Sequence, residues 1–376
     1  MKEFDKLVAE HVRTLGGYVP GKATKQAERE TGVRCIKMAS NENPFGPSPR
    51  ALEAIRRAAA DVHLYPDNDV SELRQKLSER HGISADNILI TAGSTSFLTL
   101  IGKTLLSPGL NAVTSERSFI IYPIVTKAAG ARLIQVTTRR DGFDLEAILK
   151  TIDENTRLVF IANPNNPTGT LLTPAEIDNF VERVPSHVCI VIDEAYSDFA
   201  EYFAERQGVE YSHSLDHVRA GRNVVVLRTF SKAHGLAGAR VGYGIAPTDL
   251  LQYFVRMKTV FSVTSMAEAG AIAALDDADH IRKSLENNAA GVKWLTGELR
   301  DLGLRVVPTW ANFLYVDVGE DAMALGKRMQ AEGIIIRPLS GGWGAPQAIR
   351  ITIGTPEQNA KLVSVLKRVL EKTTVP

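Results

Sequence analysis

Cysteine is scarce, neither sign of charge predominates, and no long apolar run occurs in this sequence of 376 residues. The two cysteines, Cys35 and Cys189, are too few for a disulfide framework or a cysteine-based zinc site. Because Cys189 lies in the apolar run His187–Ile192, we expect it to be a buried structural thiol rather than a reactive one. The sequence therefore indicates neither a disulfide scaffold nor a metal site.

The charge balance and the lack of an apolar segment narrow the possible partners. Lysine and arginine number 44 against 43 aspartates and glutamates, so a formal net charge of +1 creates no global field that would attract nucleic acid or an anionic membrane. No window approaches the roughly 20 apolar residues of a membrane span, and the charged start Met1–Arg13 is unlike a signal peptide. We therefore expect a cytoplasmic protein with local anion sites.

Short β-branched runs alternate with amphipathic helical stretches from about residue 85. Helices are expected to begin near Thr95, Tyr122, Leu145 and Pro174, each long enough for a crossover between parallel strands. This alternation predicts a doubly wound α/β domain with a mostly parallel sheet. The expected strands are Asn87–Thr91, Asn111–Thr114, Arg132–Val136, Leu158–Ala162, Val188–Ile192, Val224–Arg228 and Val241–Ile245.

The pattern changes after about residue 260, and the length exceeds what one hydrophobic core usually serves. We predict an N-terminal arm over 1–30 that packs on the small domain or a partner subunit, a large domain over 31–262, and a small α+β domain over 263–376. The expected elements of the small domain are a helical region Met266–Leu302, strands Asn312–Val316, Ile334–Arg337 and Ala348–Ile353, and a closing helix Pro356–Lys372.

Ligands of parallel α/β sheets bind beyond the carboxyl ends of the strands. After the first expected strand, Gly93, Ser94 and Thr95 open a helix, where free backbone N–H groups could bind a phosphate. A Ser/Thr helix cap after a glycine turn is the alternative. After Leu158–Ala162, a loop stiffened by two prolines could hold Asn166 as a fixed amide donor, or could simply be a proline-rich turn.

Two further strand ends carry ionisable groups. Asp193, followed by Tyr196, ends a buried strand and needs a cation, which could be a protonated pyridine nitrogen or a protein lysine or arginine. Lys232 lies between a buried strand and a glycine-rich segment, flanked by Thr229 and Ser231 and followed by Arg240. An isolated lysine is usually a surface charge, but desolvation and a neighbouring cation would lower its pKa, as a Schiff-base amine requires.

At these residues the sequence resembles fold type I pyridoxal-phosphate aminotransferases, and among them the histidinol-phosphate aminotransferase family. The resemblance implies that Lys232 forms the Schiff base with the cofactor and carries a proton during the reaction. It also implies that Asp193 keeps the pyridine nitrogen protonated, while Asn166 and Tyr196 bond the phenolic oxygen of the ring. The matching segments are Gly17–Gly21, Ser40–Pro47, Tyr65–Asp67, the Asn166–Gly169 loop, Asp193–Tyr196, the Lys232 motif and Arg350–Thr355.

The resemblance assigns the remaining site residues to the cofactor phosphate, the ring and the substrate. Phe119 would stack on the ring, and Tyr65 would reach the phosphate from the partner subunit of a homodimer with shared active sites. The other implied phosphate contacts are Ser94, Thr95, Ser231 and Arg240, and Gly93 and Thr229 are further implied cofactor contacts. The implied substrate contacts are Tyr18, Asn43, Arg337 and Arg350, with a structural ion pair as the alternative for Arg337.

The implied reaction transfers the amino group of histidinol phosphate to 2-oxoglutarate, giving glutamate, within histidine biosynthesis. An aromatic amino acid aminotransferase is the alternative, and an amino-acid phosphate decarboxylase would use the same cofactor residues. A cofactor-binding regulator would need a DNA-binding segment, and the chain has no basic stripe for one. Thr95 and Ser96 stand where many family members carry an acidic pair, and Glu116–Phe119 departs from the usual proline-containing segment.

Overall fold

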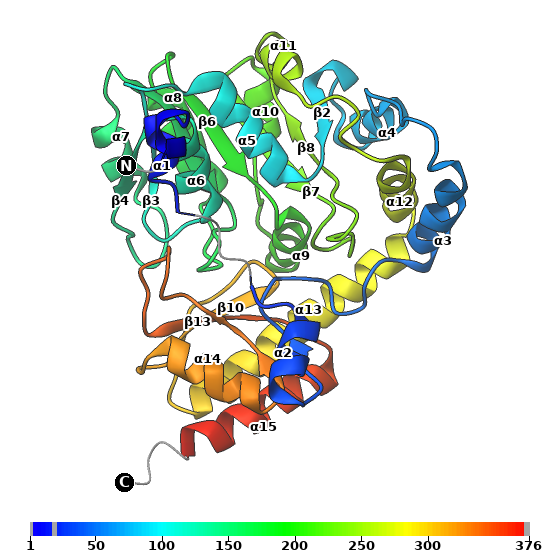
Figure 1. Ribbon diagram of the computed structural model, residues 1–376, viewed down its shortest axis with the longest axis vertical. Coiled ribbons are helices and arrows are strands. Elements are labelled where there is room, and N and C mark those ends of the chain that lie inside the picture. Colours follow the sequence, from blue (N-terminus) through cyan, green and yellow to red (C-terminus); the bar gives the residue numbers. More distant parts are fainter. Residues whose placement is uncertain (1–2, 17–20, 372–376) are drawn as a thin grey trace.

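The computed structural model describes residues 3–16 and 21–371, whose strands form sheets of seven, four and two strands (Figure 1). In the seven-stranded sheet β8 is antiparallel to both of its neighbours, and the other pairs are parallel. Its order is β2 (Ile88–Thr91), β8 (Gly242–Ile245), β7 (Val224–Thr229), β6 (Cys189–Asp193), β5 (Thr156–Ala162), β3 (Asn111–Ser115) and β4 (Arg132–Val136). The prediction of a mostly parallel sheet is confirmed.

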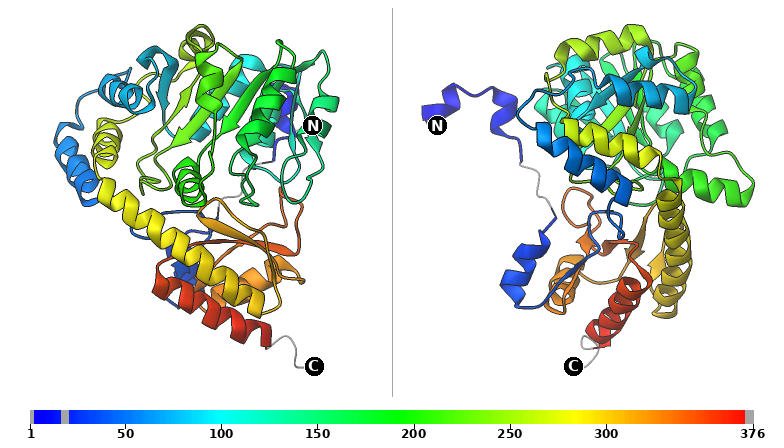
Figure 2. Two further views of the ribbon diagram at one scale, coloured as in Figure 1. Left: turned by 180° about the vertical axis from the view of Figure 1, so that it is seen from behind. Right: turned by 90° about the vertical axis from the view of Figure 1, so that its right-hand side faces the viewer.

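Helices cover the large sheet on both sides (Figure 2). On one side α5 packs on α6 and α11, and on the other α8 packs on α7 and α10. Strands β3 and β6, neither of them at an edge, are buried along their whole length, as expected for a parallel sheet enclosed by helices. The bounds of these helices are α5 Ser94–Leu105, α6 Ile121–Ala128, α7 Leu145–Thr151, α8 Pro174–Arg183, α9 Ser197–Gln207, α10 Ser214–Arg219 and α11 Thr248–Met257.

A second hydrophobic core lies under the four-stranded sheet and combines both ends of the chain. The sheet has the order β12 (Arg337–Pro338), β13 (Ala348–Thr352), β10 (Phe313–Asp317) and β9 (Arg305–Val306), all antiparallel. Beside it, β1 (Ile36–Lys37) pairs with β11 (Ile334–Ile335), and Met38 belongs to this core. We expected this segment to belong to a large domain that begins at residue 31, but it pairs and packs with the C-terminal unit.

The helices after residue 262 differ from the expected pattern at one point. The predicted helical region Met266–Leu302 is two helices, α12 (Ser265–Leu275) and α13 (Ala278–Asp301), because the Asp277 side chain caps a new helix by accepting from the His280 N–H. α12 packs on α3, whereas α13 runs on to the second core. The remaining helices include α2 Thr24–Thr31, α3 Pro49–Ala58, α4 Ser71–His81, α14 Ala322–Ala331 and α15 Pro356–Glu371.

The N-terminal segment touches both units. Its short helix α1 (Glu10–Arg13) contacts α6, and α2 contacts α14. Among the described residues, no helix has both the length and the apolar character that a membrane crossing requires.

Candidate active site

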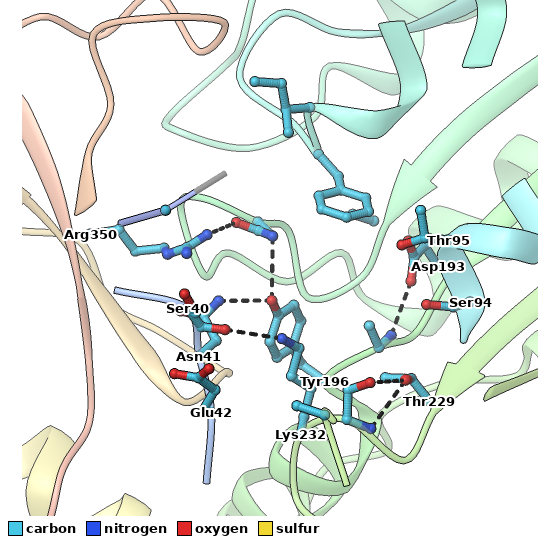
Figure 3. Close-up of a pocket in the computed structure, with 18 of the residues that line it drawn as sticks. Ser40, Asn41, Glu42, Ser94, Thr95, Asp193, Tyr196, Thr229, Lys232 and Arg350 are labelled. Atoms are coloured by element: carbon cyan, nitrogen blue, oxygen red, sulfur yellow. Dashed lines mark hydrogen bonds between the residues drawn. The ribbon is translucent and has the colours of Figure 1, made fainter. Parts of the chain in front are cut away.

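A cavity of about 260 Å³ lies where the carboxyl ends of the central strands face the four-stranded sheet (Figure 3). It brings together residues that are far apart in the sequence, as the rule for parallel sheets predicts. Of the predicted site residues, those lining it are Ser94, Thr95, Phe119, Asn166, Asp193, Tyr196, Thr229, Ser231, Lys232, Arg240, Arg337 and Arg350.

Lys232 follows β7 and extends into this cavity. Its Nζ donates to the Ser40 carbonyl at 3.2 Å and lies 5.8 Å from the centre of the Tyr196 ring. Desolvation, followed by the nearby charges of Arg350 and Arg240, lowers the pKa of Lys232 to about 8. A lysine with this pKa supplies far more neutral amine near neutral pH than a solvated one, so the surface-charge alternative is wrong.

Asp193 ends β6 and is 3% exposed. Its carboxylate accepts from the Tyr122 hydroxyl at 3.0 Å and from the Ala195 N–H at 3.2 Å. Burial raises the pKa of Asp193 to about 6, although the Tyr122 hydrogen bond opposes the rise. Within the described chain Asp193 forms no ion pair, whereas the neighbouring Glu194 pairs with Arg228 at 2.8 Å. Arg228 therefore pairs with Glu194, and the salt bridge considered for Asp193 is not found among the described residues.

The loop after β5 and the helix start after β6 form a hydrogen-bonded group. Arg350 Nη1 donates to Asn166 Oδ1 at 2.6 Å, and Asn166 Nδ2 donates to the Tyr196 hydroxyl at 3.3 Å. Burial raises the pKa of Tyr196, while Arg350 and a hydrogen bond from Asn41 oppose that rise. The loop is thus more than a proline-rich turn, since its amide is held between the arginine and the phenol.

The helix start after β2 forms a concave wall with Arg240. Gly93, with φ of 85°, is the N-cap of α5 and makes no side-chain cap hydrogen bond, so the Ser/Thr cap alternative is wrong. The positive φ explains the glycine, because residues with a Cβ rarely adopt it, and a Cβ here would also contact the Arg240 guanidinium. Thr229 donates to Ser231 at 3.0 Å, and Arg240 lies 3.5 Å from the Ser231 hydroxyl. Hydroxyls, helix N–H groups and a guanidinium here suit an anion.

Two predicted residues, Asn43 and Tyr65, lie away from the lining of this cavity. Asn43 does not line the cavity, because its amide donates to the Ala233 carbonyl at 2.8 Å and the Ser284 hydroxyl at 2.9 Å, so its expected substrate contact is not supported. Tyr65 is 84% exposed and its ring packs against Phe261, with 4.8 Å between centroids. Tyr18 falls outside the described residues.

Sequence reasoning missed several residues of the wall. Asn41, Glu42 and Trp343 line the cavity, and the Arg337 guanidinium lies 5.1 Å from the Trp343 ring centre. No ion pair of Arg337 occurs in the described part of the chain, which leaves the structural ion-pair alternative without support. Asn41 belongs to the segment Ser40–Pro47 already noted in the sequence, but its role depends on contacts with β13 that no local pattern reveals.

Comparisons with known proteins agree on one family. The aminotransferase class I and II family matches residues 33–366. Histidinol-phosphate aminotransferase 2 of Pseudomonas fluorescens is 43% identical over 98% of this chain and 99% of its own, and the histidinol-phosphate aminotransferase of Akkermansia muciniphila is 43% identical over 96% and 98%. The structure of the Sinorhizobium meliloti histidinol-phosphate aminotransferase in complex with pyridoxal-5'-phosphate matches with a TM-score of 0.88 at 30% identity, over 98% of both chains.

A double mutant of Thermus thermophilus aspartate aminotransferase has the same fold, with a TM-score of 0.81 at 22% identity over 96% of this chain and 99% of its own. The expected fold class, a fold type I α/β transferase with a smaller α+β unit, is thereby confirmed. Near full-length identity above 40% places the chain more narrowly. The chain belongs to the class I and II aminotransferases and, within them, to the histidinol-phosphate aminotransferase family.

Proposed function

We propose that this chain binds pyridoxal 5'-phosphate in the cavity and transfers the amino group of histidinol phosphate to 2-oxoglutarate. The observation that carries the proposal is Asp193, a buried carboxylate that forms no ion pair with any described residue and lines the same cavity as Lys232. The protonated pyridine nitrogen of the cofactor would be the positively charged partner of this carboxylate. The family membership and the cofactor of the Sinorhizobium meliloti relative support the same assignment.

The residues present fit each part of the cofactor. Ser94, Thr95, Ser231 and Arg240 offer donors to a phosphate, and Asp193 offers an acceptor to a ring nitrogen. Between these groups, Lys232 supplies an amine and Tyr196 supplies a hydroxyl. Phe119 lines the cavity and packs edge-on against Tyr122, which leaves an aromatic face available for stacking on a flat ring.

Once bound, pyridoxal phosphate supplies an aldehyde carbon that takes up amino groups and a ring that withdraws electrons from them. Lys232, in its neutral form, can accept a proton from the substrate carbon and return it, because its pKa lies close to neutral. Asp193 would hold a proton on the ring nitrogen, and Tyr196 would donate a hydrogen bond to the phenolic oxygen. Arg337 and Arg350 of the second unit line the opposite side of the cavity from the strand ends.

Substrate anions would be held by the arginines contributed by the second unit. Arg350 on β13 and Arg337 on β12 face each other across the sheet register and both line the cavity. Two guanidinium groups suit the doubly charged phosphate of histidinol phosphate, and Arg350 can hold the carboxylate of glutamate in the other half of the reaction.

A half-reaction panel tests the substrate assignment. Purified enzyme loaded with cofactor is mixed separately with histidinol phosphate, phenylalanine, tyrosine and glutamate, and the loss of the visible cofactor absorbance is followed. We expect histidinol phosphate to react with a kcat/KM at least about tenfold above that of either aromatic amino acid, because only it offers a dianion to both arginines. Preference for phenylalanine or tyrosine would make the chain an aromatic aminotransferase, and release of carbon dioxide from an amino-acid phosphate would make it a lyase.

We also infer a homodimer that shares its active sites. An exposed apolar patch consists of Val62, Leu64, Tyr65, Val260 and Phe261, each between 43% and 84% exposed. Phe261 packs on Tyr65, and its N–H donates to Asn68 Oδ1 at 3.0 Å, so the two segments of the patch lie together. A cluster of large apolar side chains on a soluble enzyme marks an interface, and a second copy would carry Tyr65 to the neighbouring cavity.

Light scattering on the eluting protein should give twice the 41.0 kDa of one chain. Leu64→Glu should shift the protein toward the monomer and lower activity with it, because a charge is costly in an apolar interface. Val209→Glu is the control, since Val209 is 51% exposed after α9 and outside the patch. A fully active monomer in wild type would contradict the inference.

A further inference from the structure

The hydroxyl of Tyr196 accepts two hydrogen bonds. Asn41 Nδ2 donates to it at 2.8 Å and Asn166 Nδ2 at 3.3 Å (Figure 3). A phenolic oxygen has two lone pairs and one proton, so both acceptor positions are taken. No acceptor for the remaining proton is found among the described residues, although the side chain is 4% exposed. The proton is therefore free for a ligand in the cavity.

The amide of Asn41 is held in one orientation by Thr352. The Thr352 hydroxyl accepts from the Asn41 N–H at 2.9 Å and donates to Asn41 Oδ1 at 3.2 Å. Because the amide oxygen already accepts from Thr352, the NH₂ group must face Tyr196. Asn312 Nδ2 donates to the Asn41 carbonyl at 3.1 Å, and Asn41 is 1% exposed. Its φ of 57° lies in the left-handed region, which asparagine and glycine tolerate best.

These contacts form a closed ring that starts and ends on one strand. Arg350 and Thr352 are two residues apart on β13, so their side chains lie on the same face. Arg350 reaches Tyr196 through Asn166, and Thr352 reaches the same hydroxyl through Asn41. The strand that carries the substrate-binding arginine thus also sets the surroundings of the phenol.

We propose that Asn41, oriented by Thr352, is a positioning residue that directs the Tyr196 proton toward the phenolic oxygen of the cofactor and strengthens that hydrogen bond. The inference rests on the proposed function. A hydroxyl that accepts a hydrogen bond becomes a better donor, because the two bonds polarise each other. The stronger hydrogen bond from Tyr196 withdraws negative charge from the phenolic oxygen. That oxygen then stabilises a proton on the nitrogen joining Lys232 to the cofactor less well, so the pH midpoint of the cofactor absorbance falls.

The test is a pH titration of the visible absorbance of bound pyridoxal phosphate. Asn41→Gly removes the amide and keeps a residue suited to the left-handed backbone, and it should raise the midpoint by about half a pH unit, the shift that corresponds to losing a fraction of one hydrogen bond. Thr352→Val should shift the midpoint in the same direction, because it leaves the Asn41 side chain in place but removes the hydroxyl that orients it. Thr352→Ser retains the hydroxyl and should keep the wild-type midpoint.

A double-mutant cycle separates positioning from a general structural effect. In a Tyr196→Phe background, which has no hydroxyl to position, Asn41→Gly should leave the midpoint where Tyr196→Phe alone puts it. The proposal would be overturned if Asn41→Gly shifted the midpoint equally in both backgrounds. It would also be overturned if Asn41→Gly, or Thr352→Val, left the midpoint of the otherwise wild-type protein unchanged. If wild-type protein bound no pyridoxal phosphate, the proposed function would fail instead, so the two failures are distinguishable.

Discussion

Replacing Lys232 by alanine is expected to reduce transamination by about 10³-fold or more, because one change removes both the amine that tethers the cofactor and the group that moves the proton. The visible absorbance of lysine-bound cofactor should disappear, while cofactor held by other contacts remains detectable by its absorbance as the free aldehyde. The measurements are the steady-state rate with histidinol phosphate and the absorption spectrum of the loaded variant.

Lys150→Ala is the matched control for this loss. Lys150 is an exposed lysine in the last turn of α7, far in sequence from the strand ends that build the cavity, so activity should stay within about twofold of wild type, as for most surface substitutions. Substantial turnover by Lys232→Ala would refute the role of this lysine, and with it the mechanism.

Asp193→Asn is expected to lower kcat/KM by about 10² to 10³-fold, the usual cost of removing one preorganised electrostatic contact. The change keeps the shape of the side chain and its hydrogen bond with Tyr122, but it removes the negative charge that would hold a proton on the ring nitrogen. Steady-state kinetics with histidinol phosphate measure the loss, and Asp86→Asn, at an exposed position before β2, provides the control.

The stability of ligand-free Asp193→Asn protein should separate chemistry from folding. The folded-state pKa of Asp193, about 6, lies above its ordinary value of 3.8, so the folded state binds its proton more tightly than the unfolded state does. Stability from this group is therefore present at low pH and lost as pH rises toward 6. At pH 7 the buried charge is a penalty, so the neutral asparagine should not lower the melting temperature. A large drop would indicate a structural role instead.

The sequence predicted the large sheet and the residues at its strand ends for a simple physical reason. Parallel strands buried on both faces are continuous apolar runs, and their carboxyl ends meet at one edge, so Asp193, Asn166 and Lys232 could be placed together without coordinates. Each of these residues needs only its own strand to be found.

The residues that the sequence misplaced depend on contacts between distant segments. Asn41 and Asn43 lie two positions apart in one motif, yet only Asn41 faces the cavity, because its left-handed backbone and its bonds to Thr352 decide the direction of the side chain. The end of one helix and start of the next at Asp277 were also not predicted. The apolar periodicity continues through this position and does not reveal that the Asp277 side chain caps a new helix. Pairing of β1 with β11 has no local signal at all.

That pairing also bears on the order in which the molecule can be completed during synthesis. Because Ile36 pairs with Ile334, β1 can form its strand pair only after nearly the whole chain has been synthesised. All seven strands of the large sheet precede residue 246, and the side chains that build its core end at Leu275. A nascent chain can thus build the side of the cavity that carries Lys232 and Asp193 well before Arg350 emerges. The residues that would bind the cofactor are thus synthesised first, and the arginines that would bind the substrate are synthesised last.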